Sequence, residues 1–139
     1  GQLHYWQVAE QGIPANMKVS VIIPTHNSEK TLERALKSVR NQTADCEIEI
    51  LLCDDHSADQ EWLGAAAMKY DCRLLHVTEG SGGPNFGRNL GIRNATGDLI
   101  AFLDHDDEWL PRKLEIQIKE INNGAEFIYS PGIARKIQG

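Results

Sequence analysis

Short apolar runs alternate with stretches of helical periodicity along most of this chain. Residues 19–23 and 47–53 are rich in β-branched and aliphatic side chains, which is typical of buried strands. Between these runs, apolar residues recur along residues 32–39 at the i, i+3, i+4, i+7 spacing of one helix face. This alternation predicts an α/β fold with a mostly parallel sheet flanked by helices.

The pattern continues toward the C-terminal part of the chain. Further strands are predicted at residues 72–77, 98–103 and 126–130. Further helices are predicted at residues 58–70, along residues 86–95 with Phe86, Leu90, Ile92 and Ala95 as the apolar positions, and after Pro111. The run 98–103 has no polar residue after Asp98, so we expect it to be a central strand covered on both faces.

Length and charge limit the class of protein. The chain has 139 residues, 41% of them hydrophobic, which suits one domain with a single core. We predict this domain at residues 17–139 and treat residues 1–16, which lack periodicity, as a leader of unknown role. A net charge of −6 argues against a general nucleic-acid binder, because such a protein needs a basic face.

Targeting signals are not evident in the sequence. No apolar run approaches the roughly 20 residues of a membrane span, and the N-terminal residues lack the apolar core of a signal peptide. The three cysteines have no C-x-x-C spacing, so reduced thiols are expected rather than a disulfide framework. We therefore expect no membrane span in this chain and a cytoplasmic location, with the full-length protein able to act at the inner face of a membrane.

Polar side chains gather where the predicted strands end. In an open parallel sheet, ligands bind beyond the carboxyl ends of the strands. The residues that follow the first, second and fourth strands are Thr25, His26, Asn27, Asp54, Asp55, Asp104, His105, Asp106 and Asp107. Arg88 opens a predicted helix beside the same edge, where its planar guanidinium can bind oxygen atoms. This convergence predicts a ligand site built from distant segments.

Asp104 and Asp106 suggest a cation site. Two carboxylates about 4 Å apart repel by roughly 4 kcal/mol at an effective dielectric of about 20, and a divalent cation reverses that sign. If the chain stays extended, both side chains project to one side. Such carboxylates suit Mg²⁺ or Mn²⁺ completed by water and substrate phosphates. The alternative is capping of the helix at Pro111, a role for which Asp107 or Glu108 is suited.

Other polar features are less specific. Residues 80–84 form a glycine-rich loop that fits neither G-x-G-x-x-G nor a P-loop, so a flexible turn is the favoured interpretation. His56 and His105 lack partners at zinc-ligand spacing, which argues against zinc. His26 is suited either to stack on a base or to be a solvated loop histidine.

Four blocks of the sequence resemble glycosyltransferase family 2, whose members have the GT-A fold and use nucleotide-diphospho-sugars. The blocks are VSVIIPTHN (19–27), CDDHS (53–57), GRNLGIRNATGDLIAFLDHDD (87–107) and WLPRKLE (109–115). They occur in family order and at family-like spacing, from about residue 19 to residue 130. The resemblance implies a Rossmann-like, mostly parallel sheet flanked by helices.

The resemblance also implies roles for three acidic residues. Asp106 would bind the divalent ion, Mn²⁺ or Mg²⁺, that bridges the diphosphate. Asp104 would approach the ribose or the metal shell. Asp55 would accept a hydrogen bond from the base, typically from uracil N3.

Four further positions match the nucleotide-binding motifs. Thr25 would line the same pocket as Asp55. His26 replaces the aromatic residue that the family often has after Pro-Thr, which leaves base stacking open. Arg88 matches the arginine of the family's A-R-N-x-G block, with Gly87 in place of the alanine.

The implied activity is transfer of a sugar from a nucleotide-diphospho-sugar to an acceptor hydroxyl. A UDP-sugar is the favoured donor, and the acceptor would be a saccharide or a lipid-linked molecule. The resemblance places this reaction in cell-envelope polysaccharide synthesis. Inverting members use a carboxylate base, which we expect beyond residue 139. The chain would then carry the donor site only, as a truncated and inactive portion. The alternative is a non-catalytic nucleotide-binding module of the same fold. A phosphotransfer receiver and a nucleotidyltransferase are disfavoured, because PTHNSEK after the first strand is neither an acidic pair nor a basic glycine loop.

Overall fold

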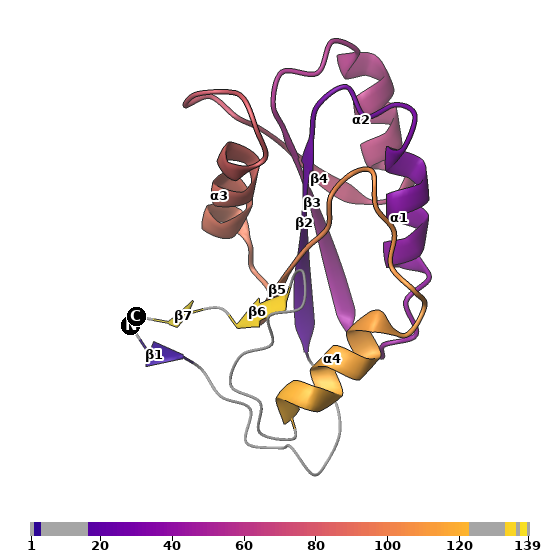
Figure 1. Ribbon diagram of the computed structural model, residues 1–139, viewed down its shortest axis with the longest axis vertical. Coiled ribbons are helices and arrows are strands. Elements are labelled where there is room, and N and C mark those ends of the chain that lie inside the picture. Colours follow the sequence, from indigo (N-terminus) through magenta and orange to yellow (C-terminus); the bar gives the residue numbers. More distant parts are fainter. Residues whose placement is uncertain (1, 4–16, 123–132, 136, 139) are drawn as a thin grey trace.

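A five-stranded sheet forms the centre of the molecule in the computed structural model, which describes residues 2–3, 17–122, 133–135 and 137–138 (Figure 1). The strands are β1 (Gln2–Leu3), β2 (Lys18–Thr25), β3 (Glu47–Asp54), β4 (Cys72–His76), β5 (Leu99–Phe102), β6 (Ile133–Arg135) and β7 (Ile137–Gln138). The helices are α1 (Leu32–Arg40), α2 (Gln60–Lys69), α3 (Asn85–Asn94) and α4 (Lys113–Asn122).

The main sheet has the order β4-β3-β2-β5-β6, and β1 pairs with β7 in a separate two-stranded ladder. Strands β2 to β5 are parallel, and β6 runs antiparallel to β5. The chain moves outward from β2 to β3 and β4, then returns to add β5 on the other side of β2. The order therefore reverses at β2, and the carboxyl ends of β2 and β5 form a topological switch point where ligands bind in open α/β sheets.

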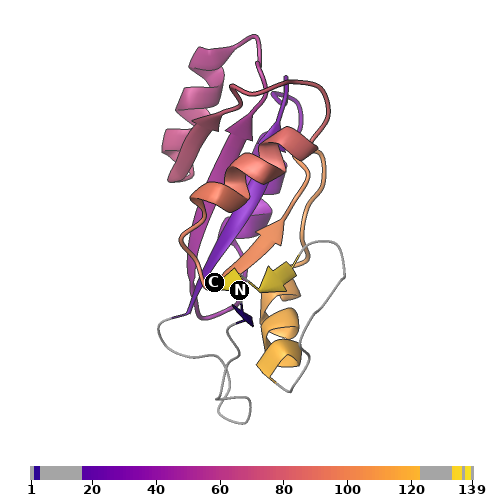
Figure 2. The same ribbon diagram turned by 90° about the vertical axis from the view of Figure 1, so that its left-hand side faces the viewer.

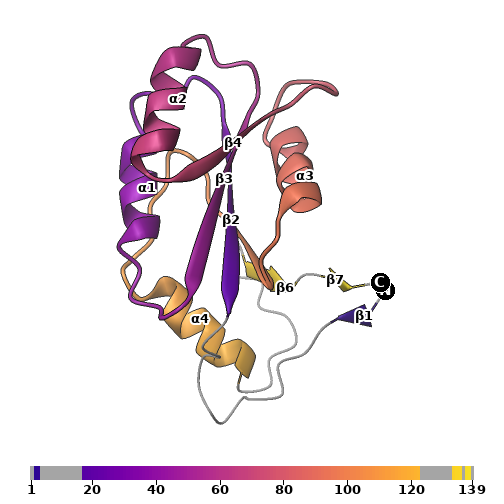
Figure 3. The same cartoon turned by 180° about the vertical axis from the view of Figure 1, so that it is seen from behind.

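Helices cover both faces of the sheet. Helices α1, α2 and α4 lie on one face and α3 on the other, as the opposed views in Figures 1 and 3 show. Along β2, Val21 and Ile23 belong to the larger core under α1, whereas Ile22 belongs to the core under α3. Strand β5 is divided in the same way, with Leu99 and Ile100 buried on opposite faces. The prediction of a central strand covered on both faces is confirmed.

Helix α3 packs on the sheet through glycines, and Figure 2 shows it lying across the parallel strands. Gly87 and Gly91 are its buried residues, while Phe86 and Ile92 are 39% and 43% exposed. A Cβ atom at Gly91 would lie 2.5 Å from Cγ2 of Ile22, so only glycine permits this approach. The helix is present where it was predicted, but its buried contact with the sheet is made by glycines, and the apolar residues Phe86 and Ile92 are partly exposed.

Two predictions lie largely outside the described residues. These are the strand at residues 126–130 and the leader at residues 1–16, of which only the short β1 is described. Both stay predictions. Within the described part of the chain, no helix has the length and apolar character needed to cross a membrane.

Candidate functional site

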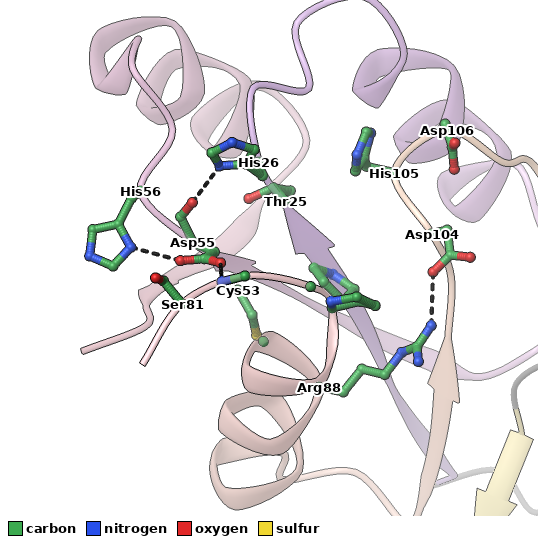
Figure 4. A pocket seen from close by; sticks show the side chains of 15 residues that line it. Thr25, His26, Cys53, Asp55, His56, Ser81, Arg88, Asp104, His105 and Asp106 are labelled. Atoms are coloured by element: carbon green, nitrogen blue, oxygen red, sulfur yellow. Dashed lines mark hydrogen bonds and ion pairs between the residues drawn. The ribbon is translucent and has the colours of Figure 1, made fainter. Parts of the chain in front are cut away.

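A cleft of about 710 Å³ opens at the carboxyl ends of β2, β3 and β5 (Figure 4). Its lining includes all of the predicted site residues, which are Thr25, His26, Asp55, Arg88, Asp104 and Asp106. Asp55 lies toward one end of the cleft in Figure 4, and Asp104 and Asp106 lie toward the other. The structure thus brings together segments up to 81 positions apart in the sequence, although the roles of the six residues stay predictions.

Asp54 fixes the corner between β2 and β3. Its buried carboxylate accepts hydrogen bonds from Oγ1 of Thr25 at 2.7 Å, from the amide of Ser57 at 3.0 Å and from Nε2 of Gln60 at 2.9 Å. Burial alone would raise the pKa of Asp54, but these hydrogen bonds, together with one from the hydroxyl of Ser57 to Oδ1 at 2.5 Å, outweigh it and lower the pKa. Asp54 is therefore a structural carboxylate, and Thr25 presents the cleft with a side chain whose hydroxyl is already engaged.

Asp55 points into the cleft and is held from two sides. Nδ1 of His56 donates to Oδ1 at 2.7 Å, and the amide of Gly82 donates to Oδ2 at 2.8 Å. The hydrogen bonds from His56 and Gly82 lower the pKa of Asp55, so the group is ionised and acts as an acceptor. Each carboxylate oxygen has a second lone pair, which leaves Asp55 able to accept a further hydrogen bond from a ligand.

The glycine loop forms the wall beside Asp55. Gly80, Gly82 and Gly83 have φ values of 90°, 91° and 85°, which glycine adopts without strain. This backbone turns the amide of Gly82 toward the carboxylate. The sequence indicated a turn here but assigned it no contact, and the only available signal was the density of glycines.

His26 lines the cleft with its ring polar atoms satisfied by the protein. Nδ1 lies 2.6 Å from the carbonyl oxygen of Asp55, which can only accept, so Nδ1 donates this hydrogen bond. Nε2 lies 3.3 Å from the side-chain nitrogen Nδ2 of Asn27, which can only donate, so Nε2 accepts. The ring face is what remains for a ligand, which is compatible with the predicted stacking on a base.

The acidic segment after β5 turns sharply. The amide of Asp107 donates to the carbonyl oxygen of Asp104 at 3.1 Å and closes a turn over residues 104–107. The chain is therefore not extended here, so the condition under which Asp104 and Asp106 would project to one side as in a strand is not met. Asp104 and Asp106 are both exposed to the cleft, and Nη2 of Arg88 lies 3.1 Å from Oδ1 of Asp104.

Helix α1 holds this turn in place. Oγ1 of Thr31 lies 2.9 Å from Nδ1 of His105, and Nη2 of Arg34 donates to the carbonyl oxygen of Asp106 at 3.1 Å. Thr31 is the N-cap residue of α1 and Arg34 lies three positions later, so both side chains are on the same side of the helix. The acidic segment is therefore attached to the helix that follows β2 as well as to its own strand.

Ser38 of α1 and Gln42, which lies just beyond the end of that helix, hold the segment that leads into α4. Oγ of Ser38 accepts from the amide of Trp109 at 3.0 Å, and Nε2 of Gln42 donates to the carbonyl oxygen of Leu110 at 2.7 Å. Oε1 of Gln42 also accepts from the amide of Leu114 in the first turn of α4. Gln42 thus supplies a helix-capping contact, the role that sequence reasoning had offered to Asp107 or Glu108. Sequence reasoning missed this polar side of α1.

The donor set suits a cation that brings other ligands with it. Among the described residues, no group of three or more His, Cys, Asp or Glu side chains is arranged to hold a metal ion. Asp104 and Asp106 supply two hard carboxylates on one turn. Mg²⁺ and similar ions bind through one or two carboxylates and complete their shell with water and phosphate oxygens. The residues present therefore fit an ion shared with a diphosphate and do not form a complete cage.

Comparison with known proteins decides the family. A model described as Glycosyl transferase family 2 matches residues 20–138. The chain belongs to this family. The match covers the cleft and all six predicted site residues, and it confirms the family proposed from the four sequence blocks.

Relatives of this family 2 chain are transferases that use nucleotide sugars. An Escherichia coli UDP-Glc:α-D-GlcNAc-diphosphoundecaprenol β-1,3-glucosyltransferase is 37% identical over 112 residues, which are 80% of this chain and 44% of that enzyme. The crystal structure of Staphylococcus aureus TarS in complex with UDP is 32% identical, with a TM-score of 0.64, over 73% of this chain and 31% of that one.

A mannosyltransferase from Pyrobaculum calidifontis in complex with GDP-Man and Mn²⁺ has a TM-score of 0.66 at 23% identity, over 86% of this chain and 39% of that one. At this identity the likeness concerns the fold alone, and the predicted GT-A fold is confirmed. The family 2 chain spans 20% of the length of two other curated relatives.

Proposed function

We propose that this chain forms the donor site of a glycosyltransferase that uses a UDP-sugar, assisted by Mn²⁺ or Mg²⁺, to glycosylate an acceptor hydroxyl. The observation that carries the proposal is the cleft itself. Six residues predicted from three separate sequence blocks line one cavity at the switch point of the sheet. Its volume of about 710 Å³ suits a nucleotide sugar, because ligand pockets are typically 300–1,000 Å³.

The end of the cleft near Asp55 would bind the base. An ionised carboxylate accepts hydrogen bonds and does not donate them, so Asp55 would favour a base that presents an N–H group, such as uracil at N3. The ring of His26 would stack on that base, and Thr25 would contact it from the floor of the cleft. The E. coli relative acts on UDP-Glc and TarS binds UDP, which supports a uridine nucleotide.

The end near Asp104 and Asp106 would bind the diphosphate. Asp106 would hold the divalent cation, and Asp104 would approach the ribose or the same metal shell. When bound, the cation would stabilise the negative charge that develops on the leaving diphosphate. Arg88, which already contacts Asp104, would orient a phosphate oxygen through its planar guanidinium.

We assign the catalytic base and the acceptor site to a region outside this cleft. In the inverting mechanism that the family resemblance implies, a carboxylate deprotonates the acceptor hydroxyl. Asp55, Asp104 and Asp106 all have donor-side roles in the proposal, so none of them is assigned as that base. A lipid-linked saccharide is the proposed acceptor, because the E. coli relative is named for a diphosphoundecaprenol substrate. The cytoplasmic location stays a prediction.

Calorimetric titration of the chain with UDP, in the presence and absence of Mn²⁺, tests this proposal, with GDP as the control nucleotide. We expect UDP to bind more tightly than GDP and to do so only with the cation. Equal binding of UDP and GDP would contradict the base assignment. Absence of binding by a folded chain would contradict the proposed donor site as a whole. Binding without sugar transfer in any longer form of the protein would favour the non-catalytic module.

A further inference from the structure

His105 is a residue of the cleft whose chemistry the proposed function leaves unused. It lies between Asp104 and Asp106 in the sequence and lines the cleft with them. His26 and His56, the other two histidines of the cleft, use Nδ1 to contact the backbone or side chain of Asp55. His105 is therefore the histidine of the lining that belongs to the acidic end of the cleft (Figure 4).

One ring nitrogen of His105 is anchored and the other is not. Nδ1 lies 2.9 Å from Oγ1 of Thr31. Within the part of the chain that the structure describes, Nε2 has no hydrogen-bond partner. The half-buried imidazole is thus held at one nitrogen, and its second nitrogen is left for a ligand in the cleft.

Thr31 contacts His105 instead of capping helix α1 with its side chain. It occupies the N-cap position of α1, where a threonine hydroxyl ordinarily accepts a hydrogen bond from the first turn of the helix. Here the side chain makes no such capping bond. The hydroxyl is directed to His105 instead, so the anchor is a specific feature of the site and not a by-product of helix capping.

The surroundings of His105 favour a hydrogen-bond donor. A diphosphate placed beside Asp104 and Asp106 meets two carboxylates, and Arg88 already contacts one of them. We propose that Nε2 of His105 donates a hydrogen bond to a phosphate oxygen of the nucleotide, while the hydroxyl of Thr31 donates to Nδ1 and thereby keeps the proton on Nε2. This inference rests on the proposed donor site. It makes His105 a binding residue and Thr31 a positioning residue.

Substitutions that mimic each ring nitrogen separately test the inference. The amide nitrogen of glutamine approximates the position of Nε2, whereas the shorter asparagine reaches only as far as Nδ1. With Mn²⁺ present, we expect His105→Asn to weaken UDP binding by about tenfold, the loss of one hydrogen bond to a charged group. His105→Gln should retain most of the affinity. Uridine, which has no phosphate, should bind both variants and the wild type equally in a chemical-shift titration.

Thr31 provides the second arm of the experiment. Thr31→Val removes the hydroxyl at constant shape and should weaken UDP binding by several-fold, while Thr31→Ser restores it. Thermal unfolding of every variant should match the wild type, which separates a binding effect from a folding effect.

Three outcomes overturn the inference. If His105→Asn matches the wild type in UDP affinity, the phosphate contact is excluded. It is also excluded if His105→Asn loses uridine and UDP affinity by the same factor. If the wild type binds UDP in a Mn²⁺-dependent way, these results leave the proposed donor site standing. If the folded wild type binds no UDP at all, both proposals fail together.

Discussion

Nη2 of Arg88 lies 3.1 Å from Oδ1 of Asp104, which joins the first turn of α3 to the end of β5 across the cleft. The two side chains are 36% and 57% exposed, so the ion pair itself adds little to stability. Its importance is positional, because it places a guanidinium among the carboxylates before any ligand binds.

Replacement of Arg88 separates cation binding from diphosphate binding. In Arg88→Ala, Asp104 loses its positive neighbour, so we expect Mn²⁺ alone to bind at least as tightly as in the wild type. We expect UDP in the presence of Mn²⁺ to bind about tenfold more weakly, because a charge-assisted contact to phosphate is lost. Calorimetry of both ligands measures the two effects. Parallel weakening of Mn²⁺ and UDP would show that Arg88 only maintains the shape of the cleft.

Asp55 should control which base is accepted. In Asp55→Asn, one of the two acceptor oxygens is replaced by an NH2 group, which donates. The side chain can then no longer accept from His56 and from Gly82 through separate oxygens. We expect the preference for UDP over CDP, whose cytosine has no hydrogen at N3, to fall by about tenfold, as one bond to a charged group is lost. Asp59→Asn is the matched control, since Asp59 caps α2 and asparagine caps equally well. An unchanged nucleotide preference in Asp55→Asn would remove Asp55 from the base site.

Glu49 on β3 makes stability depend on pH. Its side chain is 9% exposed, and it accepts hydrogen bonds from Ser20, from Thr96 and from Arg73 at 2.6–3.0 Å. Burial works against ionisation, but the hydrogen bonds outweigh it and lower the pKa of Glu49 from 4.5 to about 2. The carboxylate therefore stabilises the folded state fully above pH 4.5, and this contribution is lost as the pH falls toward 2.

Glu49→Gln tests this account. We expect it to lower the free energy of unfolding by about 3 kcal/mol at pH 7, and by progressively less below pH 4.5. Glu47→Gln, on the same strand but with a 69% exposed side chain, should change stability little at either pH. Urea denaturation at pH 7 and pH 3 measures the difference, and a constant effect of Glu49→Gln across that interval would contradict the pKa assignment.

Two glycine-to-alanine substitutions in helices should have opposite signs. At Gly91 the added methyl group would meet the buried side chain of Ile22, so we expect a loss of about 1–3 kcal/mol of stability. At Gly64 in α2 no atom lies within 4 Å of the added group, so alanine should stabilise the protein by about 0.5–1 kcal/mol. Thermal unfolding distinguishes the pair. Stabilisation of the same size at both sites would mean that α3 does not rest closely on β2.

The sequence predicted the site residues at the strand ends better than it predicted the contacts that hold these residues in place. Thr25, Asp55 and Asp106 follow runs with clear strand periodicity, and parallel strands bring such positions to one edge. The contact between Gly82 and Asp55 spans 27 positions, and the contact between Thr31 and His105 spans 74. Neither contact can be predicted from a local sequence pattern. Any residue except proline has a backbone amide, and polar residues on a helix that contact another segment look the same in sequence as polar residues exposed to solvent.

We propose above all that Asp106 holds the cation that recruits the nucleotide. Asp106→Asn removes the carboxylate charge and keeps the main-chain bond to Arg34, so the fold should be unaffected. Asp107→Asn makes the same charge change one residue later, where the carboxylate accepts from the amide of Glu108.

The most direct measurement is the UDP affinity of wild type, Asp106→Asn and Asp107→Asn, each titrated with and without Mn²⁺ and checked by thermal unfolding. We predict that Mn²⁺ tightens UDP binding by about tenfold or more in the wild type and in Asp107→Asn, and has no effect in Asp106→Asn. Retention of the full Mn²⁺ effect in a folded Asp106→Asn variant would contradict the account.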